Sequence, residues 1–289
     1  MRFASLLVCF TAFGLLGFDF AGQSEVSADP VVLTFFDENG DGVNGRGFYD
    51  YDVDSGTTTF RRPLDIGSPR ALDFAKRPDG RWFATNAQTL PGQLHRVTID
   101  KGQFGLKGET PGTIYQSVEF DPTSGLLYGN TWTGNSNPEQ LVTIDPATGQ
   151  IINVLGNLGA KRMRIGFDDN GNMFGFVGSS SGGSLRGAFY SINKSNGQLT
   201  FMSTNNTLIR NVAIDMAYAS DGFFYSIDHN SNVYRFDPVT GVGTDLGFTG
   251  TGSGIFGVAV NVVNVPEPGT FAAGFAGLGL FAARRRRRA

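Results

Sequence analysis

Short runs of alternating apolar and polar residues dominate the chain between about residues 29 and 262. Runs such as Leu141-Val-Thr-Ile144 and Val233-Tyr-Arg-Phe236 alternate with clusters of Gly, Asn and Asp. Alternation with a period of two predicts half-buried strands, and no amphipathic run of useful length predicts a helix here. The pattern therefore predicts an all-β domain over residues 29–262.

An internal repeat organises these expected strands. Each unit has an apolar run, a tight turn that contains Gly, and a second apolar run. The aromatic positions ahead of the turns lie 46, 47 and 51 residues apart, at Phe74, Phe120, Phe167 and Tyr218. Four strands in a unit of this length are typical of a propeller blade.

Each unit ends in a second hairpin, clearest at the turns Asp145-Pro-Ala-Thr-Gly149 and Asp237-Pro-Val-Thr-Gly241. Asp bonds to its own backbone, Pro presets φ and Gly takes the positive-φ position. Residues 48–56 form such a hairpin without a first one, and residues 256–260 form an innermost strand without partners. Together with residues 31–36 they complete a blade. We therefore predict a β-propeller of about five four-stranded blades, closed by the two ends of the domain.

The first 28 residues have the pattern of a secretory signal. Arg2 precedes an apolar stretch from about Phe3 to Gly17, and Val26-Ser27-Ala28 supplies small residues for cleavage after Ala28. The apolar run is shorter than the ~20 residues that a membrane span requires. A retained signal anchor is the alternative.

The segment 263–289 has three parts in a fixed order. Pro266, Glu267 and Pro268 come first, and an apolar run follows from Phe271 to Ala283. An unbroken basic cluster then consists of Arg284, Arg285, Arg286, Arg287 and Arg288. Arginines hold a short apolar helix in a membrane from the cytoplasmic side. The 13 residues of the apolar run favour transient insertion over a permanent anchor.

This tail resembles the PEP-CTERM sorting signal of Gram-negative bacteria. The resemblance covers about the last 25 residues and does not bear on the fold ahead of them. It implies a signal peptidase and an exosortase-type processing enzyme as partners, with transient membrane insertion. It also implies export through the inner membrane to the cell surface, outer envelope or extracellular matrix. A plain tail anchor with basic flanks is the alternative.

Charge and cysteine content narrow the class of protein. The whole chain has a formal net charge of −3, and the tail takes five arginines with it, so the middle is more acidic. Overall charge therefore argues against a nucleic-acid partner. Cys9, the only cysteine, lies in the signal segment, so the exported domain has no disulfide and depends on a packed core.

Loops at one face of the expected propeller carry the binding candidates. Trp132 with Asn130 suits stacking and hydrogen bonding to a sugar, although a Trp folded onto the blade is the alternative. The expected links between blades hold Arg162, Arg164 and Arg210, which together suit an anionic polymer. Scattered solvated charges are the other interpretation of these arginines.

Asp37, Asn39 and Asp41 match the first half of a calcium loop, with Gly42 at the sixth position. The twelfth position, which requires a bidentate Glu, is Phe48. The segment therefore suits either a calcium site or a solvated turn, and no other cofactor is expected.

The sequence offers little for catalysis. Asp73 and Glu119 take equivalent places when Phe74 is aligned with Phe120, and both facing the channel would make an acid/base pair or a cation site. Structural pairing with water is the alternative, and neither His95 nor His229 lies in a catalytic motif.

The sequence thus leaves two functions open. The leading one is an exported, non-enzymatic surface or matrix protein whose propeller binds polysaccharide or protein. The alternative is a secreted propeller enzyme, of hydrolase or lactonase type, since propellers host both.

Overall fold

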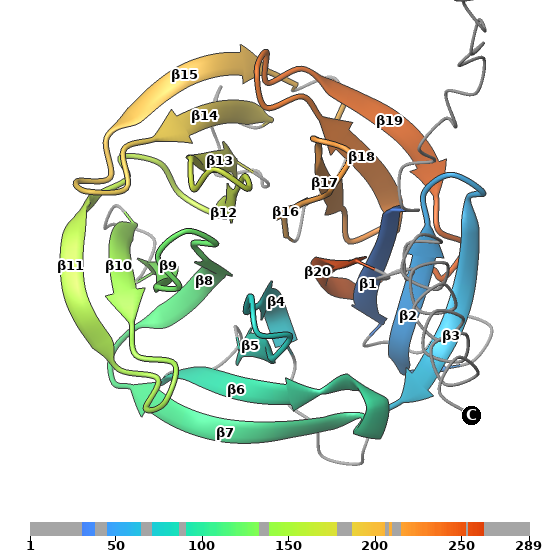
Figure 1. Cartoon of the computed structure of the whole chain (residues 1–289), viewed down its shortest axis with the longest axis horizontal. Helices are drawn as coiled ribbons and strands as arrows, with labels where there is room; N and C mark the ends of the chain where they lie inside the picture. Colours follow the sequence, from blue (N-terminus) through green and yellow to red (C-terminus); the bar gives the residue numbers. More distant parts are fainter. Residues whose placement is uncertain are drawn as a thin grey trace, which may run out of the picture.

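The computed structural model describes residues 31–37, 45–64, 71–86, 91–132, 139–177, 187–205, 208–209, 215–252 and 254–262. Within these ranges, strands β1 to β20 form five antiparallel sheets of four strands each. The sheets stand around a common axis, with the first strand of each repeat innermost (Figure 1). The predicted five-bladed propeller is therefore confirmed. The signal segment 1–28 and the tail from residue 263, with their expected helices, lie outside the described residues.

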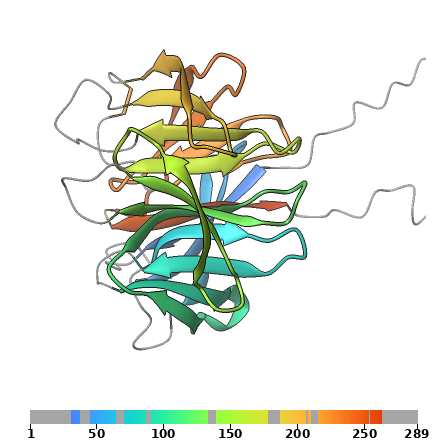
Figure 2. The ribbon, with the colours of Figure 1, turned by 90° about the vertical axis from the view of Figure 1, so that its left-hand side faces the viewer.

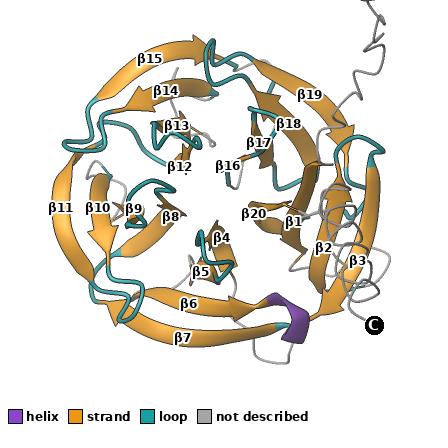
Figure 3. Cartoon of the chain, in the orientation of Figure 1, coloured by secondary structure: helices purple, strands orange, loops and turns teal. Residues whose placement is uncertain are grey.

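Four blades use consecutive strands of the chain. Their bounds are β4 Ala71–Lys76, β5 Trp82–Asn86, β6 Gly92–Thr98 and β7 Gln103–Thr110; β8 Ile114–Phe120, β9 Leu127–Trp132, β10 Gln140–Ile144 and β11 Ile151–Asn157; β12 Met163–Phe167, β13 Met173–Val177, β14 Ala188–Ile192 and β15 Leu199–Thr204; β16 Ala217–Tyr218, β17 Phe224–Ile227, β18 Asn232–Phe236 and β19 Gly243–Phe248. One short 3-10 helix, η1 (Ile99–Lys101), joins β6 to β7 (Figure 3).

The fifth blade joins the two ends of the domain. Its order is β20 (Ile255–Val262), β1 (Val31–Asp37), β2 (Gly47–Asp52) and β3 (Thr57–Pro63). β1 lies antiparallel to β20, with Val31 opposite Val262. Pairing the two ends ties the ring together, because the last innermost strand would otherwise lack its sheet. The closure predicted from the two incomplete units is confirmed.

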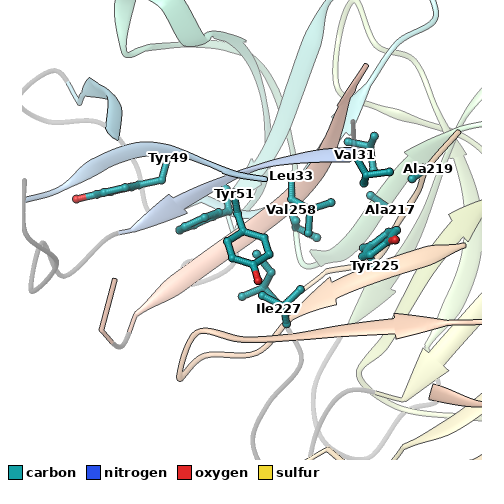
Figure 4. Packing of buried hydrophobic residues seen from close by; sticks show 12 residues of the cluster. Val31, Leu33, Tyr49, Tyr51, Ala217, Ala219, Tyr225, Ile227 and Val258 are labelled. Atoms are coloured by element: carbon teal, nitrogen blue, oxygen red, sulfur yellow. The ribbon is translucent and has the colours of Figure 1, made fainter. Parts of the chain in front are cut away.

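Apolar side chains pack between neighbouring blades and form the cores. One cluster lies between the fifth blade and the β16–β19 blade, where Leu33, Tyr51 and Val258 meet Tyr225 and Ile227 (Figure 4). In another cluster, aromatic rings interlock at centroid distances of 5.8 to 6.4 Å: Phe36, Phe48, Phe74 and Phe104. Such ring pairs add to burial through favourable edge and offset contacts, so they support a domain without disulfides.

Buried aspartates organise the turns that follow the innermost strands. Asp121 accepts hydrogen bonds from the Thr123 backbone N–H at 2.9 Å and from the Ser124 hydroxyl at 2.8 Å. Lys194 of the next blade donates to the same carboxylate at 2.7 Å. Burial alone would raise the pKa of Asp121, but these donors outweigh it and hold the pKa well below its usual range.

Among the residues described, no helix is long and apolar enough to cross a membrane.

Candidate functional site at the propeller axis

The innermost strands β4, β8, β12, β16 and β20 are sheet edges, so one side of each faces the axis. A buried backbone N–H without an acceptor costs about 1–3 kcal/mol, so these edges need partners inside the channel. At one level of the axis, each innermost strand or the residue just before it has a backbone N–H group that donates to a side chain. These groups belong to Phe74, Val118, Ile165, Met216 and Val258. All five N–H groups are bonded to side chains that fill the axis.

Asp215 accepts three of these hydrogen bonds. Its Oδ2 accepts from the Phe74 N–H at 3.0 Å and from the Val258 N–H at 2.8 Å. Its Oδ1 accepts from the N–H of its neighbour Met216 at 2.7 Å. One carboxylate therefore joins β20 and β4 to the start of the β16 region.

Gly257 allows β20 to approach Phe74 of β4 closely. It lies within β20, directly before Val258, with φ +61°. A Cβ added there would lie 2.1 Å from Cδ2 of Phe74. Only glycine combines this conformation with this close approach.

Asp73 and Ser117 accept the remaining two hydrogen bonds. Asp73 Oδ2 accepts from the Val118 N–H of the next blade, and Ser117 Oγ accepts from the Ile165 N–H at 3.1 Å. Each side chain thus reaches one blade further round the ring. We call Asp73, Ser117, Arg164 and Asp215 the axial ring.

Arg164 completes the charge balance of the axial ring. The side chain is only 3% exposed, and its Nη1 donates to the backbone oxygen of Gln116. Burial lowers the pKa of Arg164, while the charges of Asp73 and Asp215 oppose that shift. The guanidinium stays charged because its pKa begins far above neutral.

Burial raises the pKa of Asp73 well above its usual range, and the charge of neighbouring Asp215 raises it further. Burial also raises the pKa of Asp215, against the hydrogen bonds that it accepts from Asp73 and from backbone donors. Two buried carboxyl groups in contact favour one shared proton over two full charges. The pair together with Arg164 is therefore close to neutral.

A second buried carboxylate, Glu139, binds both Asn130 and the backbone of Arg162. Glu139 accepts from the Met163 N–H at 3.1 Å, from the Arg162 N–H, and from Nδ2 of Asn130 at 2.5 Å. Burial raises the pKa of Glu139, and these hydrogen bonds oppose the shift. Glu139 thereby fixes the start of β12, which positions Arg164.

The structure corrects the alignment of the first repeat by two residues. Lys76 pairs with Trp82 next to its turn, as Phe120 pairs with Leu127, so Lys76 rather than Phe74 corresponds to Phe120. Asp73 consequently corresponds to Ser117, and the predicted equivalence of Asp73 with Glu119 is wrong. Asp73 belongs to the axial ring, whereas Glu119 lies nearer the end of the axis.

A cavity opens at the end of the axis where the Asp-Gly turns lie. Its volume is about 590 Å³, and residues of all five blades line it. Its polar and aromatic lining includes Lys76, Asp79, Glu119, Asp169 and Tyr218. We call it the turn-end cavity. The sequence analysis did not predict a cavity among these turns.

The lining groups of the turn-end cavity are partly exposed, in contrast to the axial ring. Burial raises the pKa of Glu119 well above its usual range, and its Oε1 accepts from the Phe120 N–H at 2.8 Å. Lys76 lies over the Trp82 ring at 5.5 Å, and burial lowers its pKa. Burial raises the pKa of Tyr218, and Asp169 adds to the shift. The cavity thus offers an aromatic ring beside groups that donate and accept hydrogen bonds.

The residues predicted for binding are separated by the fold. Asn130 is fully buried and Arg164 lies within β12, so the expectation that these two are exposed loop residues is wrong. Arg162 is exposed with φ +55°, and Trp132 is partly exposed at the end of β9. Arg210 lies outside the described residues. Binding at Trp132 and Arg162 stays a prediction.

The calcium prediction is only partly covered. Asp37 is buried at the end of β1, while Asn39 and Asp41 lie outside the described residues. Across the part of the chain that is described, no three His, Cys, Asp or Glu residues gather closely enough to hold a metal ion. The histidines lie apart from the turn-end cavity lining: His95 is buried beside Gln93, and His229 accepts from the Gly254 N–H at 2.9 Å.

The fold and repeat define a five-bladed propeller, and comparison with known proteins gives its family. The chain belongs to the family described as "Repeat of unknown function (DUF6923)", whose profile matches residues 82–265. A PEP-CTERM protein-sorting motif matches residues 264–288, which include Pro266 to Pro268 and Arg284 to Arg288. This motif marks the protein as exported and sorted to the cell surface or envelope by the exosortase route.

Solved structures are similar in fold at low sequence identity, and no curated protein matches the chain. A chain of the nidogen/laminin complex is 15% identical, with a TM-score of 0.50 over 81% of this chain and 85% of that chain. A Bacteroides caccae protein of unknown function is 13% identical, with a TM-score of 0.43 over 74% and 72%. Acinetobacter baumannii TolB is 14% identical, with a TM-score of 0.49 over 75% of this chain and 53% of that one. The first likeness supports the propeller fold and nothing beyond it.

Proposed function

We propose that this protein is an exported binding module that holds saccharide groups of extracellular polysaccharide in the turn-end cavity. The observation that carries the proposal is the lining of that cavity by partly exposed Tyr218 beside Glu119, Asp169 and Lys76. Sugars pack their apolar faces on aromatic rings and bond their hydroxyl groups to charged and amide side chains. A volume of about 590 Å³ is within the range of small-molecule sites.

The sorting motif supports an extracellular ligand for this module. Export delivers the propeller to the cell surface, outer envelope or extracellular matrix, where polysaccharide and surface proteins are the available partners. Signal peptidase would cut after Ala28, and an exosortase-type enzyme would act at the Pro266–Pro268 segment. Mass spectrometry of protein recovered from the cell exterior tests both cuts. Recovery of chains that still carry Arg284 to Arg288 contradicts processing of the tail.

A glycan-binding screen tests the cavity directly. Wild type binds at least one saccharide class, and Tyr218→Leu weakens that binding about tenfold, equivalent to about 1.4 kcal/mol, because the stacking ring is lost. Phe201→Leu is the matched control, since Phe201 is 58% exposed on the outer strand β15, away from the axis. Equal affinity of both variants and wild type contradicts binding in the cavity.

A secreted hydrolase is the second candidate, and the raised pKa of Glu119 favours it. A carboxyl group that keeps its proton near neutral pH is suited to general acid catalysis. Incubation of wild type and Glu119→Gln with candidate polysaccharides, followed by reducing-end analysis, separates the two functions. Turnover by wild type that is lost in Glu119→Gln favours the hydrolase, whereas binding without turnover favours the module.

Arg162 supplies a separate test of the prediction that an anionic polymer binds at the other end of the propeller. Arg162 is exposed at the opposite end of β12 from the turn-end cavity. If an anionic polymer contacts that end, Arg162→Glu weakens binding to acidic polysaccharide and leaves binding to neutral saccharides unchanged. Calorimetry with calcium, on the same protein preparation, tests whether the segment that begins at Asp37 binds this ion.

A further inference from the structure

Both segments that leave the propeller do so at the end that carries the turn-end cavity. β1 begins at Val31, which lies opposite Val262 at the end of β20 in an antiparallel pair. Val260, two residues before Val262, lines the cavity itself. Figure 2 shows β1 and β20 together within the ring, seen from the side. The N-terminal entry and C-terminal exit of the domain are therefore neighbours beside the cavity mouth.

The sequence limits how far the sorting tail reaches from this point. Eight residues, 263–270, separate Val262 from Phe271, where the apolar segment begins. A fully extended chain covers at most ~3.3–3.6 Å per residue, so Phe271 lies within about 30 Å of Val262. The predicted cut after Ala28 is closer still, because only Asp29 and Pro30 precede Val31.

We propose that the cavity end of the propeller faces the membrane for as long as the sorting tail is inserted, and that removal of the tail opens the cavity to polymers. The opening of the cavity to polymers rests on the proposed saccharide function. The orientation rests only on the direction of β1 and β20 and on the length of the segment between Val262 and Phe271. A polymer must enter a gap of about 30 Å or less in the precursor, whereas the released domain is accessible from all sides.

The charge at this end argues against direct docking onto the bilayer. Asp79, Asp169 and Asp221 lie in or next to the turns around the cavity, and anionic lipid headgroups repel them. Arg77 and Arg81 are engaged with Asp79, at 3.6 Å and 2.6 Å. The gap between the propeller and the membrane therefore stays hydrated, so small molecules still reach the cavity.

Single cysteines provide the test, because Cys9 is the only cysteine of the chain. In a Cys9→Ser background, Ser220→Cys places a thiol on an exposed turn at the cavity end. Pro111→Cys places a matched thiol in the exposed link from β7 to β8, where the chain enters the opposite end of the axis. The full chain is inserted into vesicles through its tail, and its reaction with a bulky polymer-linked maleimide is timed. The bilayer is then dissolved with detergent and the measurement repeated.

The orientation predicts a several-fold slower reaction at Ser220→Cys than at Pro111→Cys in vesicles, with the difference removed by detergent. N-ethylmaleimide, which is small, reacts at the same rate in both settings. Equal rates with the bulky reagent in vesicles, or failure of the chain to bind vesicles, overturn the proposal. Neither rate depends on a saccharide, so a failed binding screen and a failed orientation remain distinguishable.

Discussion

The two levels of the propeller axis carry similar residue types in opposite settings. The axial ring is fully buried, and Asp73 and Asp215 accept hydrogen bonds from the innermost strands. The lining of the turn-end cavity is partly exposed, and Glu119 accepts its hydrogen bond from the next residue only. An acidic residue near the axis is therefore structural where it accepts hydrogen bonds from the backbone N–H groups of neighbouring innermost strands. It is available to a ligand where it accepts no such bond from another strand.

The largest effect is expected for Asp215→Ala, which leaves the N–H groups of Phe74, Met216 and Val258 without an acceptor. Three buried donors without partners cost about 4 kcal/mol or more in the free energy of unfolding. Urea denaturation measures the loss. Asp215→Asn is the control, because its amide oxygen still accepts and a smaller loss follows. A stable Asp215→Ala variant contradicts a structural ring.

Arg164→Met comes next, because it leaves the Asp73–Asp215 pair without its buried cation. Breaking a buried ion pair from one side costs about 3 kcal/mol. The matched control is Arg162→Met, two residues earlier and exposed, which changes stability by less than about 0.5 kcal/mol. Equal losses in the two variants remove the distinction between buried and surface arginines.

The pH dependence of stability tests the burial of Asp73 in the axial ring. Burial raises the folded-state pKa of Asp73, so the folded protein binds more protons than the unfolded chain above about pH 4. Stability is then complete at low pH and falls as pH rises towards the raised pKa, by at most about 1.4 kcal/mol per pH unit for one proton. Asparagine at position 73 cannot titrate, so the stability of Asp73→Asn relative to wild type improves as the pH rises above about 4. A difference in stability that stays constant as the pH rises from about 4 to neutral contradicts the raised pKa.

Glu119→Gln is expected to have the smallest effect on folding. Glutamine keeps an oxygen that accepts from the Phe120 N–H, so the free energy of unfolding changes by less than about 0.5 kcal/mol. Thermal denaturation checks this directly. A loss as large as that of Arg164→Met would place Glu119 with the axial ring.

The sequence predicted the fold well because its strands, turns and closure leave local patterns. The incomplete hairpin at residues 48–56 and the lone strand at residues 256–260 indicated the fifth blade correctly. The site was harder, because Phe74 is aromatic but lies two residues before the position of Phe120, Phe167 and Tyr218. Aligning Phe74 with Phe120 therefore paired Asp73 with Glu119, whereas the structure shows that Asp73 corresponds to Ser117.

The members of the axial ring share one position of the repeat, three residues before Lys76, Phe120, Phe167 and Tyr218, but their side chains differ in type and charge. The hydrogen bond from the Phe74 N–H to Asp215 joins residues that lie 141 positions apart, so no local pattern indicates it. Arg164 stands in sequence beside the interblade link, and only the register of β12 with β13 places it in the interior. The sequence analysis did not find Glu139, because its partners, two backbone N–H groups at the start of β12 and the Asn130 side chain, lie 9 to 24 residues away along the chain.

One titration tests the division between the two levels most directly. The saccharide selected by the wild-type screen is titrated calorimetrically into Asp73→Asn and into Tyr218→Leu, both checked for a folded circular dichroism spectrum. The account predicts wild-type affinity for Asp73→Asn and about tenfold weaker binding for Tyr218→Leu. Loss of binding in Asp73→Asn with full binding in Tyr218→Leu would contradict it.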